Sequence, residues 1–62
     1  MEINNVTIGN RIKELRTSKN LTQEDIAKMV KVSKATISNY EKGKVSPPIE
    51  LLIKLAERYD VS

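Results

Sequence analysis

Residues 22–43 read TQEDIAKMVKVSKATISNYEKG, and this stretch decides the fold. Thr22, followed three residues later by Asp25, is a capping-box pattern that begins a helix. Ser33 is a second N-cap, and Gly43 stands where a left-handed residue ends a helix. The pattern predicts two helices joined by a two-residue link, which forces the sharp corner of a helix-turn-helix. These helices are expected over about 22–30 and 33–42.

A helix is also expected before this stretch, over about 8–18, with Thr7 as its N-cap. Asn20 suits a left-handed stop after it. Residues 1–7 show no clear period and are expected to form an arm. The apolar stripe of this helix recurs at helical spacing and consists of Ile8, Ile12 and Leu15.

A fourth helix is expected over about 48–59, because proline is tolerated in a first helical turn. Leu51 and Ile53 fall outside its predicted stripe, and together they hint at a covering element or partner. The predicted buried stripe consists of Ile49, Leu52, Leu55, Ala56 and Tyr59. The sequence therefore predicts an all-α fold, a compact bundle of four short helices.

The composition excludes several kinds of functional site and segment. The chain has 62 residues, no Cys and no His, so one domain is expected, without a disulfide, an imidazole base or a thiolate metal ligand. No apolar run approaches the roughly 18 residues of a membrane span. The first residues, MEINNVT, lack the basic head and apolar core of a signal peptide. We expect a cytoplasmic, nucleoid-associated protein with no metal and no cofactor.

Positive charge is concentrated in one part of the chain. Residues 28–44 hold five lysines against Glu41 alone, a local charge of +4 in a chain whose net charge is +3. A lysine cluster is more often a solvated face than a binding site. By itself, the asymmetry favours a polyanionic partner only modestly.

The helix over 33–42 has two different sides. At about 100° per residue, Ile37 and Tyr40 fall on one side. The other side carries short polar and basic residues, namely Lys34, Ala35, Ser38, Asn39 and Lys42, with Thr36 on the border. An ordinary surface helix with small side chains would account for this face equally well.

That face fits the major groove of DNA, which is about 12 Å wide and admits one helix. Asn39 can pair with the edge of adenine, and Lys34 can donate to guanine acceptors. Ala35 offers a methyl contact to thymine. Ser38 and Thr36 can donate to base or phosphate oxygens.

Glu41 is an acid inside the basic segment, at the margin of the buried side. We expect it to pair with Arg16, which sits at the edge of the apolar stripe over 8–18. The alternative is two independent surface charges. A buried pair would tie the first helix to the third, and removing one member would cost about 3–5 kcal/mol.

Residues 8–62 resemble the helix-turn-helix domain of phage lambda- and Cro-type repressors, the xenobiotic-response-element family. The resemblance is carried by residues of the second and third helices and of the segments that follow them. These are Gln23 after the second cap, Ile26-Ala27, the corner Val32-Ser33, Ile37, the run 41–44 (EKGK), the following Pro and the closing Val61-Ser62. It implies a lambda repressor-like fold. It also implies base reading by Lys34, Ala35, Ser38 and Asn39, and phosphate contacts by Gln23, Thr36, Lys42 and Lys44. Gln23 is further expected to brace the third helix, and Arg16 and Glu41 match the interhelical ion pair of the family.

The sequence departs from the family at two points. The family usually has Gly in the corner where this chain has Lys31. A left-handed backbone there would cost a non-glycine residue about 1–2 kcal/mol, and Lys31→Gly would then be stabilising; otherwise the corner is slightly rearranged. The family also commonly continues past Ser62 into a fifth helix that packs on the fourth and often helps dimerisation. We expect that helix to be missing, which would account for Leu51 and Ile53.

The leading expectation is sequence-specific binding of double-stranded DNA by a transcriptional regulator, most of all a phage- or prophage-type repressor. The full-length protein would be a homodimer, with an effector or oligomerisation domain absent from this chain. Two alternatives stay open: the antitoxin of a toxin–antitoxin pair, and a protein-interaction module that has lost DNA binding. An enzyme is not expected, because no catalytic nucleophile–base arrangement is present.

Overall fold

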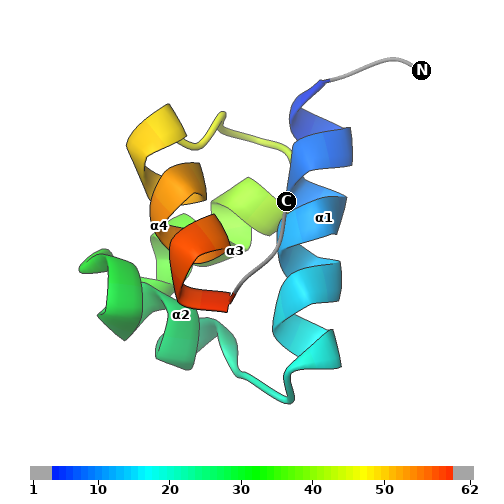
Figure 1. The fold of residues 1–62 in the computed structure, drawn as a ribbon. Helices are drawn as coiled ribbons and strands as arrows, with labels where there is room; N and C mark the ends of the chain where they lie inside the picture. Colours follow the sequence, from blue (N-terminus) through cyan, green and yellow to red (C-terminus); the bar gives the residue numbers. More distant parts are fainter. Residues whose placement is uncertain (1–3, 60–62) are drawn as a thin grey trace.

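The computed structural model describes residues 4–59 and shows four helices in that range. They are α1 (Asn5–Ser18), α2 (Gln23–Val30), α3 (Lys34–Glu41) and α4 (Ile49–Tyr59). α1 runs along one side of the molecule, and α2, α3 and α4 gather beside it (Figure 1). The predicted all-α bundle of four short helices is confirmed. The predicted arm at 1–3 and the closing Val61 and Ser62 lie outside the described residues.

The two capping patterns of residues 22–43 both form. The Thr22 hydroxyl accepts from the Asp25 N–H at 3.0 Å, and the Asp25 carboxylate accepts from the Thr22 N–H at 2.8 Å. The hydrogen bond from the Thr22 backbone N–H lowers the pKa of Asp25, because it favours the charged carboxylate. The Ser33 hydroxyl accepts from the Thr36 N–H at 3.1 Å and begins α3. The sequence patterns therefore mark both helix starts to within one residue.

α1 begins at Asn5, three residues earlier than predicted, so the expectation of an arm over 1–7 is wrong for residues 5–7. The N-cap is Asn4, whose side chain accepts from the Thr7 N–H at 2.9 Å. Asparagine caps helices at least as well as threonine, which explains why the earlier position is used. The added turn packs against the chain after α3, where a Cβ placed on Gly43 would meet Val6 Cγ2 at 2.8 Å.

The core is built from all four helices. Ile26 of α2 and Ile37 of α3 are fully buried, and Ile12 of α1 and Leu55 of α4 lie against them. Other buried apolar residues in the described range include Ala27, Val30, Tyr40 and Leu51.

The predicted buried stripe of α4 is partly wrong. Leu51 is only 5% exposed, whereas Ile49, predicted to be buried, is 70% exposed. Leu51 and Leu55, one turn apart, face the core, while Leu52 and Ala56 face α1. α4 thus uses two adjacent apolar sides, and a single stripe could not describe it. Ile53 is half exposed, as expected.

α1 and α3 approach each other closely at Gly9. A Cβ added to Gly9 would lie 2.2 Å from the Tyr40 carbonyl oxygen and 2.8 Å from that of Glu41. Both oxygens are backbone atoms, so neither can move aside like a flexible side chain. Glycine is therefore required for α1 to lie this close to the end of α3.

An ion pair locks the same two helices together. Arg16 Nε donates to Glu41 Oε2 at 2.7 Å, and Arg16 Nη2 donates to Glu41 Oε1 at 3.1 Å. The side chains are 15% and 4% exposed, respectively. Arg16 Nη1 also donates to the Leu21 carbonyl at 3.0 Å, so one guanidinium joins α1, α3 and the link before α2. The hydrogen bond with Glu41 raises the pKa of Arg16 above its already high value.

Three residues in the described range have a left-handed backbone: Asn20, Lys31 and Gly43, with φ of 58°, 61° and 77°. Each follows or nearly follows a helix, as expected for these positions. Glycine adopts this conformation freely, and asparagine tolerates it. For Lys31 the left-handed backbone costs about 1–2 kcal/mol.

Removing Arg16 should be strongly destabilising. Arg16→Met leaves the buried Glu41 carboxylate without its counter-charge, so we expect the free energy of unfolding to fall by about 3–5 kcal/mol. Arg16→Met combined with Glu41→Leu should recover much of that loss, since no unpaired charge is left. Urea denaturation followed by circular dichroism measures both. A loss within about 1 kcal/mol for Arg16→Met would mean that the pair behaves as an exposed one.

Gly9→Ala should also destabilise the domain, by about 1–3 kcal/mol, because the methyl group forces α1 away from α3. Helix propensity alone predicts the opposite, a gain of about 1 kcal/mol. The neighbouring exposed substitution Asn10→Ala is the matched control and should be neutral or stabilising. Thermal melts of the two variants decide the sign, and a more stable Gly9→Ala would contradict the close approach.

Candidate nucleic-acid interface

α3 presents its short polar side chains away from the core. Lys34 and Ala35 are exposed, and Ser38 and Asn39 are half-buried, while Ile37 on the opposite side is fully buried. Within residues 4–59, no side-chain hydrogen bond or ion pair engages Lys34, Ser38 or Asn39. Their polar groups are therefore available to a partner. The structure brings the four predicted base-reading residues onto one face.

Thr36 lies at the border of that face, half-buried. Its hydroxyl is 2.8 Å from the Ser33 hydroxyl, which also caps the helix. One hydroxyl donates to the other, which leaves the second O–H as a donor for one more hydrogen bond. Two hydroxyls therefore meet at the N-terminal end of α3, beside Lys34.

Gln23 begins α2 and reaches across to α3. Its Nε2 donates to Glu41 Oε1 at 3.1 Å, so the expected brace between Gln23 and the third helix is present. Glu41 thereby accepts from both Arg16 and Gln23. The first turn of α2 also contains Glu24 and Asp25. Their negative charges weaken the attraction of this helix N-terminus for an external anion.

Lys42 and Lys44 follow α3 and are exposed. The turn that holds them is closed by two backbone hydrogen bonds, from the Gly43 N–H to the Tyr40 carbonyl at 3.1 Å and from the Lys44 N–H to the Asn39 carbonyl at 3.0 Å. This is the Schellman pattern, and it requires the left-handed backbone seen at Gly43. Lys44 is thus fixed beside the C-terminal end of α3.

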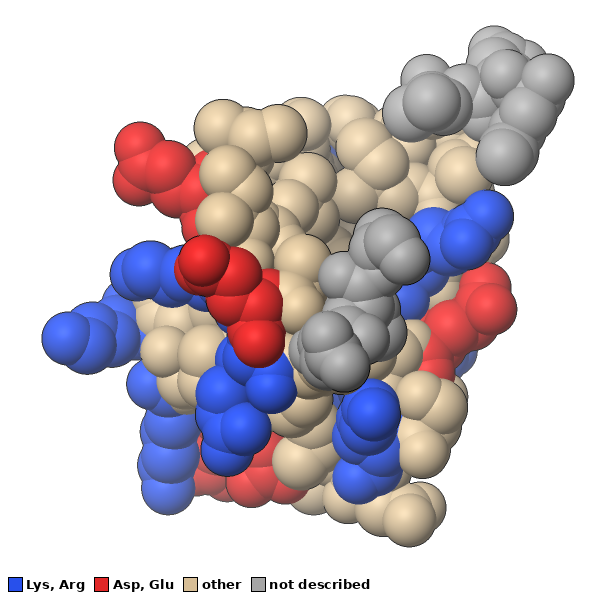
Figure 2. All heavy atoms as spheres, viewed as in Figure 1, with Lys and Arg blue, Asp and Glu red and all other residues tan. Residues whose placement is uncertain are grey.

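Cations therefore stand at both ends of α3, with Ala35, Ser38 and Asn39 between them. Figure 2 shows Lys and Arg side chains projecting from the left of the view, where Figure 1 places α2 and its turn into α3. One of the lysines of this region, Lys28, is 4.0 Å from Glu24, and both side chains are highly exposed. At that exposure the pair contributes little to stability.

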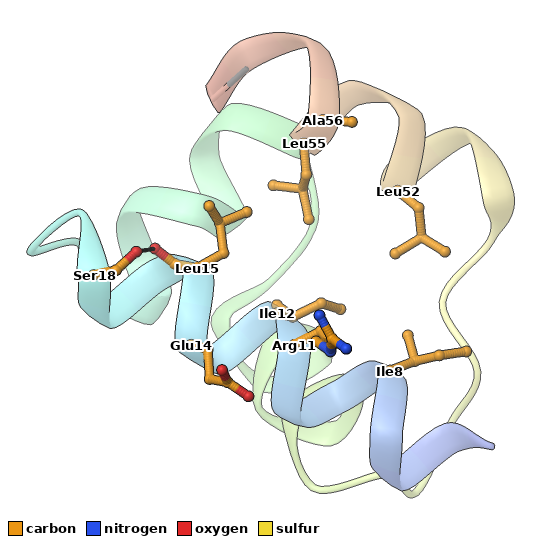
Figure 3. Close-up of a pocket in the computed structure, with 9 residues that line it drawn as sticks. All are labelled: Ile8, Arg11, Ile12, Glu14, Leu15, Ser18, Leu52, Leu55 and Ala56. Carbon is orange, nitrogen blue, oxygen red and sulfur yellow. Dashed lines mark hydrogen bonds between the residues drawn. The ribbon is translucent and has the colours of Figure 1, made fainter. Parts of the chain in front are cut away.

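A separate hollow of about 570 Å³ lies between α1 and α4. Figure 3 shows Ile8, Ile12 and Leu15 on one wall, with Leu52, Leu55 and Ala56 opposite them. Its polar lining consists of Arg11, Glu14 and Ser18, and the Ser18 hydroxyl donates to the Leu15 carbonyl at 2.9 Å. No residue of α3 contributes to it, so it is distinct from the candidate interface.

Two packing features that position α3 were not foreseen from sequence. Gly9 was overlooked, because a glycine inside a helix pattern gives no sign of which backbone it approaches. The hydrogen bond from Arg16 to the Leu21 carbonyl was also not anticipated.

None of the helices in the described range has the length and hydropathy of a membrane-spanning segment.

Known proteins share this arrangement. The HTH_3 family model, described as helix-turn-helix, matches residues 12–62. The chain is 46% identical over 52 residues to the uncharacterized HTH-type transcriptional regulator MJ0272 of Methanocaldococcus jannaschii, covering 84% of this chain and 79% of that protein. It is 42% identical over 53 residues to the cryptic phage CTXphi transcriptional repressor RstR of Vibrio cholerae, covering 86% of this chain and 48% of RstR.

The fold also matches the crystal structure of the restriction-modification controller protein C.AhdI from Aeromonas hydrophila. The TM-score is 0.82 at 31% identity, covering 94% of this chain and 88% of that one. Family model, relatives and structure agree with the resemblance drawn over residues 8–62. The chain belongs to the HTH_3 family of helix-turn-helix transcriptional regulators.

Proposed function

We propose that this chain is the DNA-reading domain of a transcriptional repressor of phage or prophage type, which binds specific double-stranded sequences through α3. The observation that carries the proposal is the unpartnered polar face of α3, opposite a fully buried Ile37. The similarity to a phage repressor supports the finer assignment. The function is binding, without catalysis and without a cofactor.

Base reading rests on side chains that are short enough to let the helix backbone approach the bases. Asn39 pairs with the N6 and N7 edge of adenine, and Lys34 donates to guanine O6 or N7. Ala35 contacts a thymine methyl group, and Ser38 donates to or accepts from a neighbouring base. Because no other side chain in the described range occupies these groups, no existing hydrogen bond must be broken first.

Phosphate contacts position the domain without reading sequence. Gln23 is held by Glu41 at the start of α2 and can turn its amide oxygen or remaining N–H outward. Thr36 stands at one end of α3, and Lys42 and Lys44 at the other. These four contacts place the DNA backbone on both sides of the inserted helix.

The full-length protein is proposed to act as a homodimer on the nucleoid. Two copies of α3 would then enter successive major grooves, about 34–36 Å apart. Each half-site alone supplies few contacts, so this chain by itself should bind weakly. A selection of bound duplexes from a random pool tests the proposal, since it should enrich one defined half-site.

Asn39→Ala and Lys44→Ala should weaken DNA binding in different ways. Asn39→Ala should relax preference at one or two base pairs, with a loss of about 1–3 kcal/mol confined to sites that carry the preferred base. Lys44→Ala should weaken binding to all sequences alike and make the plot of log K against log salt shallower by about one unit. Fluorescence anisotropy with selected and scrambled duplexes at several salt concentrations measures both.

Asn10→Ala, on the exposed face of α1, is the control for asparagine removal and should leave binding unchanged. An equal loss on every duplex for Asn39→Ala would remove that residue from the base-reading set. If the unmodified chain shows no salt-dependent binding to any duplex, the proposed function is wrong.

A further inference from the structure

Lys31 has a backbone conformation that does not suit its residue type. Its φ and ψ are 61° and 45°, in the left-handed region, and it directly follows α2. Of the three left-handed residues in the described range, Gly43 has no Cβ to clash and Asn20 belongs to a type that tolerates this region. Lys31 has neither advantage.

Nothing in the fold offsets this strain through the side chain. Lys31 is exposed, and within residues 4–59 no hydrogen bond or ion pair engages its ammonium group. Its backbone N–H donates to the Ala27 carbonyl, but glycine would make the same bond. Strained residues that the fold does not require are found at functional sites.

The position of Lys31 agrees with such a role. It precedes the cap Ser33 by two residues, so it lies at the N-terminal end of α3, the end that carries Lys34 and Ala35. When a helix enters the major groove, phosphates line both walls, about 12 Å apart. A lysine on the turn above that end has a flexible stem and three N–H donors to offer to one wall.

We propose that Lys31 binds a DNA phosphate at the corner between α2 and α3, and that this contact is why a strained lysine stands there. The inference rests on the proposed function and adds a residue to the phosphate-binding set. The Lys31 contact lies at the opening end of α3, and Lys42 and Lys44 lie at its far end. The DNA backbone is then held at both ends of the reading helix.

Four variants separate charge from strain. Lys31→Asn removes the cation and keeps a residue that tolerates a left-handed backbone. Lys31→Gly removes both the cation and the strain, whereas Lys31→Arg keeps the cation. Lys54→Gln, at an exposed position of α4, removes one positive charge away from α3 and is the matched control.

The probe is a labelled duplex of about 20 base pairs with a random centre, long enough for two half-sites one turn apart. Lys31→Asn and Lys31→Gly should each make the plot of log K against log salt shallower by about 0.9. Between about 50 and 200 mM salt, their loss of affinity relative to the unmodified chain should therefore shrink about 3.5-fold. Lys31→Arg and Lys54→Gln should keep the unmodified slope. Lys31→Asn should melt no lower than the unmodified chain and Lys31→Gly should melt higher, which excludes unfolding as the cause of weaker binding.

The outcomes separate this inference from the proposed function. If Lys31→Asn keeps the full slope while Lys44→Ala loses about one unit, Lys31 makes no phosphate contact and the proposed function stands. A lower melting temperature for Lys31→Gly would overturn the strain on which the inference rests. If the unmodified chain binds no duplex in a salt-dependent way, the proposed function and this inference fail together.

Discussion

The bidentate pair between Arg16 and Glu41 is the interaction on which the orientation of α3 depends. α3 has only eight residues, and Ile37 and Tyr40 are its buried apolar anchors. Burial of Ile37 and Tyr40 sets which side of this short helix faces inward, but apolar burial is not directional and leaves the fine rotation open. Hydrogen bonds have preferred angles, and Glu41 accepts three of them, from Arg16 and Gln23. The fine rotation of α3 is therefore set by a carboxylate on its inner edge.

The same pair solves an electrostatic problem. Glu41 is the acidic residue of the lysine-rich stretch 28–44, and a carboxylate pointing at solvent there would repel a polyanion. Burial against Arg16 turns that charge inward and balances it. The Glu41 charge then does not oppose the lysines around α3 when they meet a polyanionic partner. The stability of the fold and the positive charge of the surface around α3 thus depend on one contact.

How far the sequence predicts this structure differs from feature to feature. Thr22, Ser33 and Gly43 act through their own neighbours, so local patterns locate the ends of α2 and α3. The ion pair was predictable because Glu41 is out of place in a basic segment. The start of α1 was not, because Asn4 and Thr7 are both acceptable caps, and the contact between Val6 and Gly43, which favours the longer helix, is long-range.

Two further features could not be read from periodicity. α4 carries apolar residues on adjacent sides, so the wheel allows more than one rotation, and packing in the core selects the one that buries Leu51. The need for Gly9 comes from carbonyl groups more than thirty positions away in the chain. Long-range backbone contacts of this kind leave no local sequence signal. The base-reading and phosphate-binding roles are predictions of chemistry, and they are decided by binding experiments rather than by the fold.

The packing of Val6 against Gly43 also has a dynamic consequence. Helix ends open more often than helix centres. Each time the first turn of α1 unwinds, the turn after α3 loses the Val6 side chain that packs against Gly43. Lys34, at the opposite end of α3, is not reached by that motion. Fraying of the first turn of α1 would therefore be felt at the C-terminal end of the reading helix rather than at its N-terminal end.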